Sequence, residues 1–582
     1  MYGSATTATT VYLLLPEIIL VAAATALFLV GAFRPLRAGA VWASLAALLV
    51  AAIALYAQDD GLKQKLWSAT APETMTSGPL VVDLFGHTVR WAILAVGLIL
   101  VLLRGQGDEQ RQSSEASASL LLMTVGLMLI ATANELILLF VGLELVSIPT
   151  YILLYLGRHD ARGQEAASKY FFLSILSSAV LLYGFSFLYG AGGSTRLELI
   201  AAALKHPTDP GSMTEIMIPV AMLLMFAGLA FRLTAVPFHF YAPDVYQGTS
   251  HANAGLLSTL PKIAGLAALA RILLTALPGW EPLGWKAVLV VSILTMTVGN
   301  ILALWQNNIR RLLAYSSIAH AGYLLIGVAV ALAFRTAAMP APAATTTVVA
   351  AATVTDASGK DETSPAVTAP SADATAGVDG LGAAMFYLAV YIFATLGAFA
   401  AFVYLSHGER QIDTLDDIAG LNRTHPMVAL TVALFMFSLA GVPPLAGFWG
   451  KFALLYSALK TPAVASSGMA LRPWFIGLAI VAVLNAAIAA AYYLRVISAM
   501  YFRPVKAAGP SRVSRAAAPG FALVICTVAV VGVGFLPGRL LDDAVRAGQS
   551  LTPQTTLAVA EHADHRLTIK TTQQPVVAAQ SR

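Results

Sequence analysis

The sequence has 582 residues, of which 58% are hydrophobic and 11% are charged. Soluble globular chains carry about 25% charged residues, so this composition excludes a soluble enzyme or a nucleic-acid-binding protein and predicts a membrane protein. The net charge of +5 fits basic loops in a membrane topology better than it fits phosphate binding. The single cysteine, Cys526, excludes intrachain disulfide bonds and cysteine-ligated clusters.

Apolar stretches follow one another along the chain, and each is long enough to cross a membrane. They lack the alternation of a β-barrel, so an all-α polytopic fold is expected, with about fourteen transmembrane helices of roughly 20 residues or more. The predicted spans are residues 11–33, 40–57, 80–103, 118–133, 135–157, 166–190, 216–248, 252–277, 284–305, 310–335, 381–406, 426–460, 472–502 and 517–537.

The loops between these spans give the orientation. Basic residues gather in the odd-numbered connections, for example Arg34 and Arg37, and Arg310 and Arg311. Because cytoplasmic loops are enriched in lysine and arginine, an even number of spans predicts that both termini lie on the outer (periplasmic) side. Residues 336–380 are rich in Ala, Thr, Val and Pro and predict a flexible outer loop, and the tail 538–582 is expected to be disordered.

Two distant segments repeat a pattern. Residues 231–237 (FRLTAVP) match residues 437–443 (FSLAGVP) at Phe, Leu, Val and Pro, and each lies inside an unusually long apolar span. Proline removes a backbone donor and clashes with the preceding turn, so the seventh and twelfth helices should break there. Paired broken helices indicate a transporter site near the membrane midplane. The alternative is two ordinary proline kinks.

Five ionisable residues lie inside the predicted spans. At a helix centre each would cost about 2.5–3.5 kcal/mol facing lipid, so they are expected to face one another or a hydrated path. A lysine removed from water holds its proton less tightly and a nearby carboxylate reverses this effect, so the set suits a proton relay. The five are Glu144, Lys169, Arg232, Lys262 and Lys451.

Plainer interpretations stay open for each of them. Static buried salt bridges would explain the same residues, Lys169 can extend from a helix end toward water, and Arg232 can act as a permanent counter-ion. Pro261, directly before Lys262, is expected to unwind the eighth helix. His320, in the tenth helix, can relay protons because its ordinary pKa is about 6.5, or it can have a hydrogen-bonded packing role.

The remaining polar residues predict no chemistry. His239, Asp244 and His251 surround the connection between the seventh and eighth helices, where solvated charges are the default expectation. A run of aspartates predicts a loop that faces solvent or a partner. The spacing of these groups does not predict a metal site. The run consists of Asp413, Asp416 and Asp417.

Several motifs occur together in one order. They are residues 142–155 (GLELVSIPTYILLY), 165–170 (EAASKY), 236–248 (VPFHFYAPDVYQG), 258–262 (STLPK), 308–323 (NIRRLLAYSSIAHAGY), 416–426 (DDIAGLNRTHP) and 441–452 (GVPPLAGFWGKF). With them the chain resembles the subunit N family, antiporter-like membrane subunits of proton-pumping NADH-quinone oxidoreductase (respiratory complex I). Lysine at 451 favours this family over a sister subunit with glutamate there.

The resemblance implies a fold and an organisation. It implies two inverted five-helix repeats, at 118–277 and at 284–502, the second interrupted by the loop 336–380. Three helices (1–117) precede them, and a last helix (517–537) and the tail follow.

The resemblance also implies roles and partners. Glu144 pairs with the cation of the sixth or seventh helix (Lys169 or Arg232), Lys262 lies in the central relay, and Lys451 lies on the path to the outer side. This chain is expected to hold no cofactor of its own, and FMN, iron–sulfur clusters and quinone are expected in partner subunits. The implied partners are the peripheral redox arm and other membrane subunits of the complex, including sister antiporter-like subunits. The implied location is the bacterial inner membrane.

Two departures from the family and two rival functions remain. Arg232 stands where the family usually has lysine, and residues 336–380 are an insertion. The rivals are a subunit of a cation/proton antiporter without a redox partner, and a scaffold with inactive channels.

Overall fold

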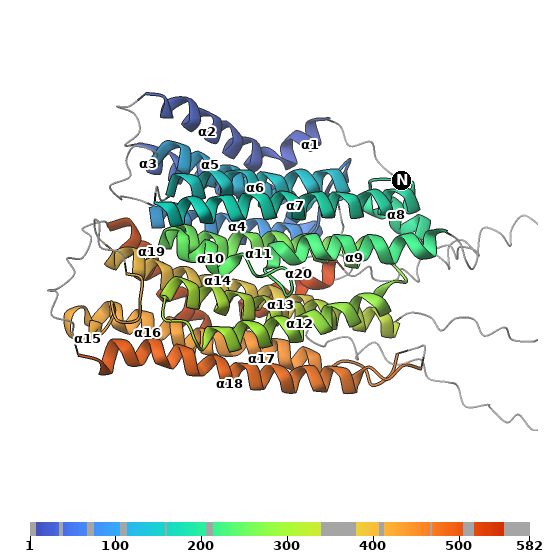
Figure 1. The fold of residues 1–582 in the computed structure, drawn as a ribbon. Helices are drawn as coiled ribbons and strands as arrows, with labels where there is room; N and C mark the ends of the chain where they lie inside the picture. Colours follow the sequence, from blue (N-terminus) through green and yellow to red (C-terminus); the bar gives the residue numbers. More distant parts are fainter. Residues whose placement is uncertain are drawn as a thin grey trace, which may run out of the picture.

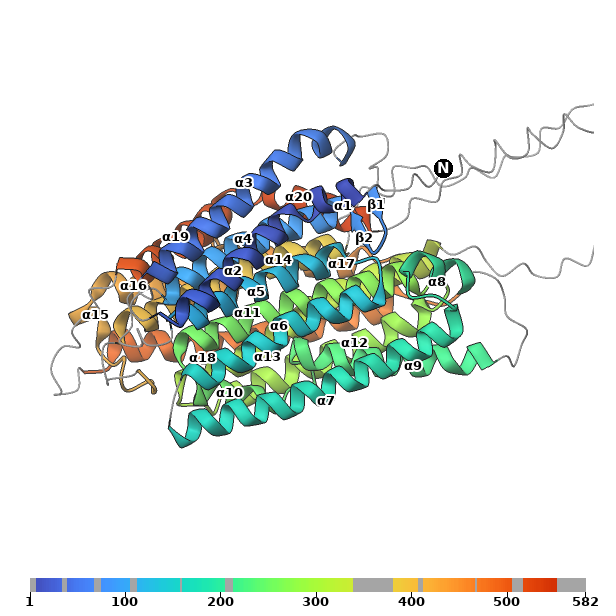
Figure 2. The ribbon, with the colours of Figure 1, turned by 90° about the horizontal axis from the view of Figure 1, so that it is seen from above.

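The computed structural model describes residues 7–33, 39–66, 75–104, 113–157, 160–204, 213–338, 380–406, 412–465, 468–504 and 517–551. Of the predicted loop 336–380, residues 339–379 lie outside these ranges, whereas 336–338 and 380 belong to helices; the tail beyond residue 551 also lies outside them. Long helices run side by side through the described part of the chain, with α8 at one end of the bundle and α15 at the other (Figures 1 and 2). This arrangement confirms the all-α polytopic fold.

The first three helices lie along one side of the bundle (Figure 1), and a short hairpin and a fourth helix follow them. They are α1 (Thr7–Leu13), α2 (Leu15–Gly31), α3 (Ala40–Leu66), the antiparallel strands β1 (Met75–Ser77) and β2 (Leu80–Val82), and α4 (Leu84–Arg104). The hairpin was not predicted, because strands of three residues are too short to leave a periodic pattern.

A run of five helices follows, of which the fourth is broken. It consists of α5 (Ser113–Thr132), α6 (Leu136–Gly157), α7 (Ala161–Gly192), the pair α9 (Met213–Leu233) and α10 (Ala242–Gly248), and α11 (His251–Arg271), which continues into the π-helical turn η3 (Ile272–Ala276). The short helix α8 (Leu197–Leu204) lies between α7 and α9.

A second run of five repeats this order, again with a broken fourth helix. It consists of α12 (Glu281–Ala303), α13 (Ile309–Ala338), α14 (Gly380–Leu405), the pair α16 (Pro426–Ala440) and α17 (Ala446–Leu459), and α18 (Arg472–Phe502), with short α15 (Leu421–Thr424) before α16. Because five is an odd number, the second run starts on the opposite side of the membrane from the first, which makes the repeats inverted. The described part of the chain ends with α19 (Ala517–Phe535), α20 (Gly538–Ser550) and Leu551.

The number of spans agrees with the sequence prediction. Among the described residues, 12 helices are long and apolar enough to cross a membrane, and two shorter apolar helices, α2 and α16, add to them. In the most apolar stretch of each helix, 100% of α11 and 94% of α13 is buried, but only 33% of α18. Thus α11 and α13 form the centre of the bundle, and the outer helices present apolar surface to lipid or to partners.

Both breaks occur where the repeated motif predicts them. Helix α9 ends at Leu233 before Thr234, which has a positive φ of 58°, and α16 ends at Ala440 before Gly441, with a φ of 92°. The peptide bonds Val236–Pro237 and Pro443–Pro444 are cis. Each break ends a helix inside the bundle and leaves backbone carbonyls without partners in their own helix.

Two local predictions are wrong. Pro261 does not unwind its helix: α11 runs on through it to Arg271, since a proline removes only one backbone donor and the bonds of the neighbouring turns remain. The first part of the supposedly disordered tail is helical, because α20 is amphipathic and its apolar face packs against α14 and α4.

Candidate proton-transfer site

Glu144 and Arg232 form a buried ion pair between α6 and α9. The Arg232 guanidinium lies 3.0 Å from Glu144 Oε1, and their side chains are 5% and 23% exposed respectively. Arg232 also donates to the Leu143 carbonyl (3.2 Å) and to the Ser147 hydroxyl, while Ser178 donates to Glu144 Oε1 (2.5 Å). The position of Arg232 at the last turn before the break brings its cation to this carboxylate.

Lys169 does not join this pair. Its ammonium lies 2.6 Å from Glu165 and 3.0 Å from Asp244 on α10, and Arg311 lies 2.7 Å from the same aspartate. These four side chains are 31–60% exposed, so their ion pairs contribute little to stability. The cation that pairs with Glu144 is therefore Arg232 and not Lys169.

Lys262 is fully buried on α11 among neutral oxygens. Its ammonium donates to Ser317 Oγ on α13 (2.5 Å) and to Thr234 Oγ1 at the break after α9 (3.4 Å). Tyr391 on α14 also donates to Ser317 (2.9 Å). No carboxylate of the described residues forms an ion pair with Lys262, so hydroxyl dipoles and the ring of Tyr391, 5.8 Å from the ammonium to the ring centroid, stabilise its charge.

His320 lies one turn after Ser317 on α13, and its ring nitrogens contact the hydroxyls of two tyrosines. Its Nδ1 lies 2.5 Å from the Tyr387 hydroxyl, and its Nε2 lies 2.9 Å from the Tyr493 hydroxyl. The Tyr391 ring, which lies near Lys262, is also close to the His320 ring, at 4.8 Å between centroids. Tyr391 therefore contacts both titratable groups.

Lys451 on α17 is held by the second break. Its ammonium donates to the carbonyls of Leu439 and Ala440 (both 2.9 Å), which the end of α16 leaves free. The side chain is 6% exposed and forms no ion pair with a carboxylate of the described residues. A cavity of about 10 Å³ lies between His320 and Lys451.

Most of the predicted site residues thus lie along one buried path. It passes from the Glu144–Arg232 pair past Thr234 to Lys262, and through Ser317 and Tyr391 to the cavity. The serines and tyrosines of this path were not predicted, because hydroxyl groups in apolar helices are common and give no signal without the fold.

Two predictions of solvated loop charges are corrected. His251 is 4% exposed, and its Nε2 lies 2.8 Å from the Ile412 carbonyl. Asp413 pairs with the buried guanidinium of Arg310 (2.5 Å), because the loop before α15 folds against the start of α13, while Asp416 pairs with Arg503 at the surface. In the described part of the chain, no group of three or more potential ligands could hold a metal ion.

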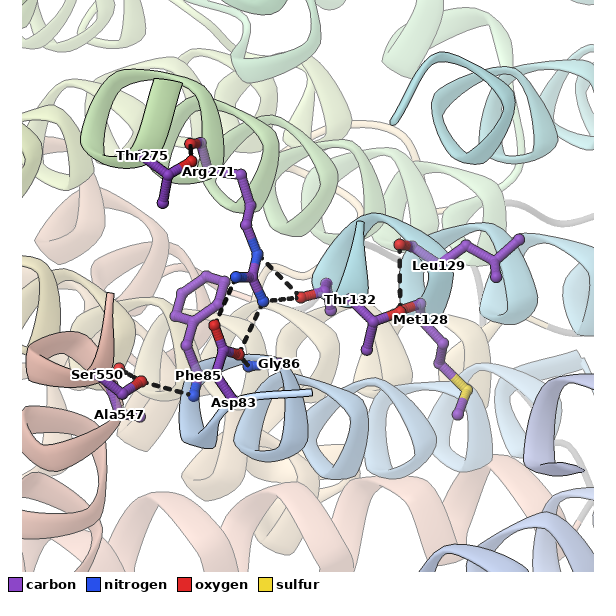
Figure 3. Close-up of polar contacts among 11 residues, drawn as sticks. Asp83, Phe85, Gly86, Met128, Leu129, Thr132, Arg271, Thr275, Ala547 and Ser550 are labelled. Carbon is purple, nitrogen blue, oxygen red and sulfur yellow. Dashed lines mark hydrogen bonds and ion pairs between the residues drawn. The ribbon is translucent and has the colours of Figure 1, made fainter. Parts of the chain in front are cut away.

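Sequence analysis also missed buried ion pairs away from this path. Asp83 and Arg271 form two contacts of 2.5 and 2.8 Å, and Figure 3 shows the guanidinium between Asp83 and Phe85. Arg90 pairs with Glu17 on α2 (2.7 Å). The sequence did hold a signal for these pairs, because all four residues are ionisable and lie within predicted spans. A charge inside a span needs a partner, and that partner can lie on another helix.

A close approach of α16 and α17 fixes the position of Lys451. A Cβ on Gly447 would lie 1.7 Å from the Ser438 carbonyl oxygen, so Gly447→Ala should push the helices apart and destabilise the protein by about 1–3 kcal/mol. Gly477→Ala on α18, where nothing lies within 4 Å, is the matched control. Thermal unfolding of the purified complex measures both variants, and equal melting temperatures would contradict the prediction.

Comparison with known proteins agrees with this geometry. Residues 133–356 and 371–472 match the family described as NADH:quinone oxidoreductase/Mrp antiporter, TM. NADH-quinone oxidoreductase subunit N of Trichlorobacter lovleyi is 35% identical, over 92% of this chain and 96% of the relative. The corresponding protein of Rhodospirillum rubrum is 34% identical, over 92% and 97%. The chain belongs to the NADH-quinone oxidoreductase subunit N family.

Solved structures agree with membership of the subunit N family. A chain of respiratory complex I from Thermus thermophilus with bound aureothin superimposes with a TM-score of 0.65 at 30% identity, covering 90% of this chain and 98% of that one. A chain of the Mrp complex from Dietzia sp. has a TM-score of 0.70 but 20% identity, and so shares the fold. As a subunit N, the chain is a multi-pass membrane subunit of an NADH-quinone oxidoreductase complex.

Proposed function

We propose that this subunit moves protons across the membrane along Glu144, Arg232, Lys262, His320 and Lys451. Electron transfer from NADH to quinone in other subunits drives this movement, as in a proton-translocating NADH:quinone oxidoreductase. Lys169, at the partly exposed end of α7, belongs to a charged cluster where protons enter or leave the path. Arg232 keeps its charge and acts by stabilising ionised Glu144.

One observation carries this proposal. Lys262 and Lys451 are buried without an ion-pairing carboxylate among the described residues. Ser317 and Tyr391 connect Lys262 to the side of the His320 ring, and a small cavity lies between His320 and Lys451. A purely structural role would favour paired charges, because an unpaired buried cation is costly. A lysine held only by neutral dipoles can instead release and regain a proton when its surroundings change.

The same proposal assigns cofactors and location to the assembly. FMN, iron–sulfur clusters and the quinone site lie in partner subunits, since a sequence with a single cysteine cannot ligate a cluster. The partners are other complex I membrane subunits, including sister antiporter-like subunits, and the peripheral redox arm. The complex lies in the bacterial inner membrane, and both termini of this chain face the periplasm.

Glu144→Gln tests the relay. The amide keeps the size of the side chain but removes its charge and its capacity to accept a proton, so proton transfer past Arg232 should slow by about a hundredfold. Protons moved per NADH oxidised in proteoliposomes should fall, while the complex stays assembled. Glu198→Gln on α8, where the carboxylate forms only a half-exposed pair with Arg196, is the control. An unchanged proton-to-NADH ratio in Glu144→Gln would contradict the relay.

Purification from the native membrane distinguishes the redox-driven pump from the rival antiporter function. If the chain copurifies from its native membrane with flavin- and iron–sulfur-containing subunits, the redox-driven pump is supported. Copurification with antiporter subunits alone would support a cation/proton antiporter. A scaffold with inactive channels predicts that Glu144→Gln has no effect on protons moved per NADH.

A further inference from the structure

The two broken helices α9 and α16 end in the same type of cap. At the end of α9, the Ala235 amide donates to the Ala230 carbonyl (2.8 Å) and the Thr234 amide donates to the Phe231 carbonyl (3.0 Å). The end of α16 has the same two bonds around Gly441. This is the Schellman arrangement, in which the residue after the helix has a positive φ and is usually glycine.

The residue with the positive φ differs between the two caps. Gly441 is the type of residue expected there, and a Cβ on it would lie 3.0 Å from Lys451 Cδ. Among the described residues, Thr234 is the only one with a side chain that has a positive φ, and it is β-branched, which makes this conformation strained. Such strain is concentrated at functional sites, so the threonine side chain points to a role that glycine could not serve.

Each cap also leaves a backbone carbonyl free at the end of its helix. The residue four positions after Leu233 is Pro237, and the residue four positions after Ala440 is Pro444, so the amide that would continue the helix is missing in both places. Free carbonyls at a helix C-terminus form the negative end of the helix dipole and favour a nearby cation.

A lysine serves the free carbonyls of each break, directly at one and through a hydroxyl at the other. Lys451 Nζ donates to two carbonyls at the end of α16 (both 2.9 Å). At the end of α9, the Thr234 hydroxyl donates to the Leu233 carbonyl (2.5 Å), and Lys262 Nζ donates to the Thr234 oxygen (3.4 Å). This direction is fixed while Lys262 is protonated, because an ammonium group only donates and a carbonyl only accepts.

The packing of α11 keeps Lys262 at this break. Gly265 lies one turn after Lys262 on the same face of the helix, and a Cβ there would lie 2.8 Å from Leu233 Cγ. Leu233, Thr234 and Lys262 are at most 2% exposed, so bulk water does not replace the threonine hydroxyl. The other hydroxyl partner of Lys262, Ser317, belongs to the second run of five helices. Thr234 is thus the hydroxyl through which the first run holds the lysine.

We propose that Thr234 is a positioning residue, whose hydroxyl connects protonated Lys262 to the negative end of α9. This inference rests on the proposed proton-translocating function and adds a residue to it. Thr234 exchanges no proton itself and acts through the lysine: the connection is favourable while Lys262 is an ammonium ion and weakens when the proton leaves. At the second break Lys451 reaches the carbonyls directly, so glycine is sufficient there.

Thr234→Val and Thr234→Ser in the intact complex are the first test. Valine keeps the size and the branch but removes one of the two hydroxyl partners of Lys262, so proton transfer should slow by about tenfold. Protons moved per NADH in proteoliposomes should fall toward the value of Lys262→Ala, whereas serine, which keeps the hydroxyl, should retain most of them. Equal values for the valine and serine variants would overturn the proposal.

Thr259→Val is the matched control for the loss of a buried threonine hydroxyl. Thr259 lies one turn before Lys262 on α11 and is fully buried, but its hydroxyl donates to the Gly255 carbonyl of its own helix (3.0 Å). Its removal should leave protons per NADH unchanged. A loss as large as that of Thr234→Val would overturn the proposal, because the effect would then not depend on contact with the lysine.

Thr234→Gly separates positioning from folding. Glycine adopts a positive φ without strain, so the melting temperature of the purified complex should stay the same or rise, while protons moved per NADH fall as in Thr234→Val. A threonine needed only for the structure would not give a variant that is as stable as the wild type and yet less active. Full proton movement in Thr234→Gly would overturn the proposal.

Lys262→Ala distinguishes a failure of this inference from a failure of the proposed function. If Lys262→Ala stops proton movement but Thr234→Val and Thr234→Gly do not reduce it, the relay stands and the inference fails alone. If Lys262→Ala has no effect, the proposed function itself fails. The double variant Thr234→Gly/Lys262→Ala should be no worse than Lys262→Ala, and a further loss would show that Thr234 acts independently of the lysine.

Discussion

Replacing either Lys262 or Lys451 by alanine is expected to stop proton movement through this subunit while the complex still assembles. In the proposed path each lysine is the proton-binding group of its segment. Lys262 lies between the break after α9 and α13, and Lys451 lies at the break after α16. Without the amine, neighbouring hydroxyls and carbonyls cannot hold the proton, and the step should slow by about a hundredfold or more.

Assembly should survive because no charge is left behind. Removing one partner of a buried ion pair costs about 3–5 kcal/mol, but neither lysine is paired with a carboxylate of the described residues. Lys460→Ala, at the exposed end of α17, is the control for the loss of a lysine from the same helix. Protons per NADH and the amount of complex on native gels are measured together, and a ratio unchanged in both buried-lysine variants would refute the relay.

Asp83→Ala is expected to prevent stable folding of the subunit. The carboxylate accepts two hydrogen bonds from Arg271 and one from the Gly86 amide (2.7 Å), and the guanidinium also donates to the Ala131 carbonyl (Figure 3). Both side chains are at most 3% exposed. The variant leaves the Arg271 cation buried without its partner, at a cost of about 3–5 kcal/mol, which is a large part of the stability of most domains.

A double variant distinguishes charge from packing in this pair. Asp83→Leu/Arg271→Met removes both charges and keeps much of the side-chain volume. The double variant should therefore be more stable than Asp83→Leu alone or Arg271→Met alone, each of which leaves one charge buried without its partner. Arg196→Ala, which removes a half-exposed partner of Glu198, should change stability by about 1 kcal/mol or less. Thermal unfolding and native-gel yield measure all three, and a double variant as unstable as Asp83→Ala would argue against the ion-pair explanation.

The sequence predicted features that depend on local chemistry. Apolar length gave the membrane spans, and the repeated FxLxxVP pattern gave both broken helices, because proline acts within one turn. Pairing of Glu144 with a cation was predictable because a charge in lipid is costly, and the choice between Lys169 and Arg232 was not. That choice depends on the rotation of α7 and α9 about their axes, which only packing determines.

The connections between helices were beyond the sequence. Tyr387 and Tyr493 bind His320, and Tyr391 binds Ser317, through hydroxyls at the ends of apolar rings. Their positions on α14 and α18 resemble ordinary core positions in the sequence. Likewise, Asp83 and Arg271 are 188 residues apart, and nothing local links them. Long-range polar contacts of this kind become visible only when the helices have been placed side by side.

The contact between α20 and α4 has a consequence for biogenesis. The Phe85 amide, at the start of α4, donates to Ser550 Oγ (3.0 Å), so one side of this hydrogen bond is synthesised 465 residues after the other. At about 5–20 residues per second, this interval is roughly 20 to 90 s. During that time the start of α4 lacks its final neighbour, so this end of the bundle is completed only after α20 has been synthesised.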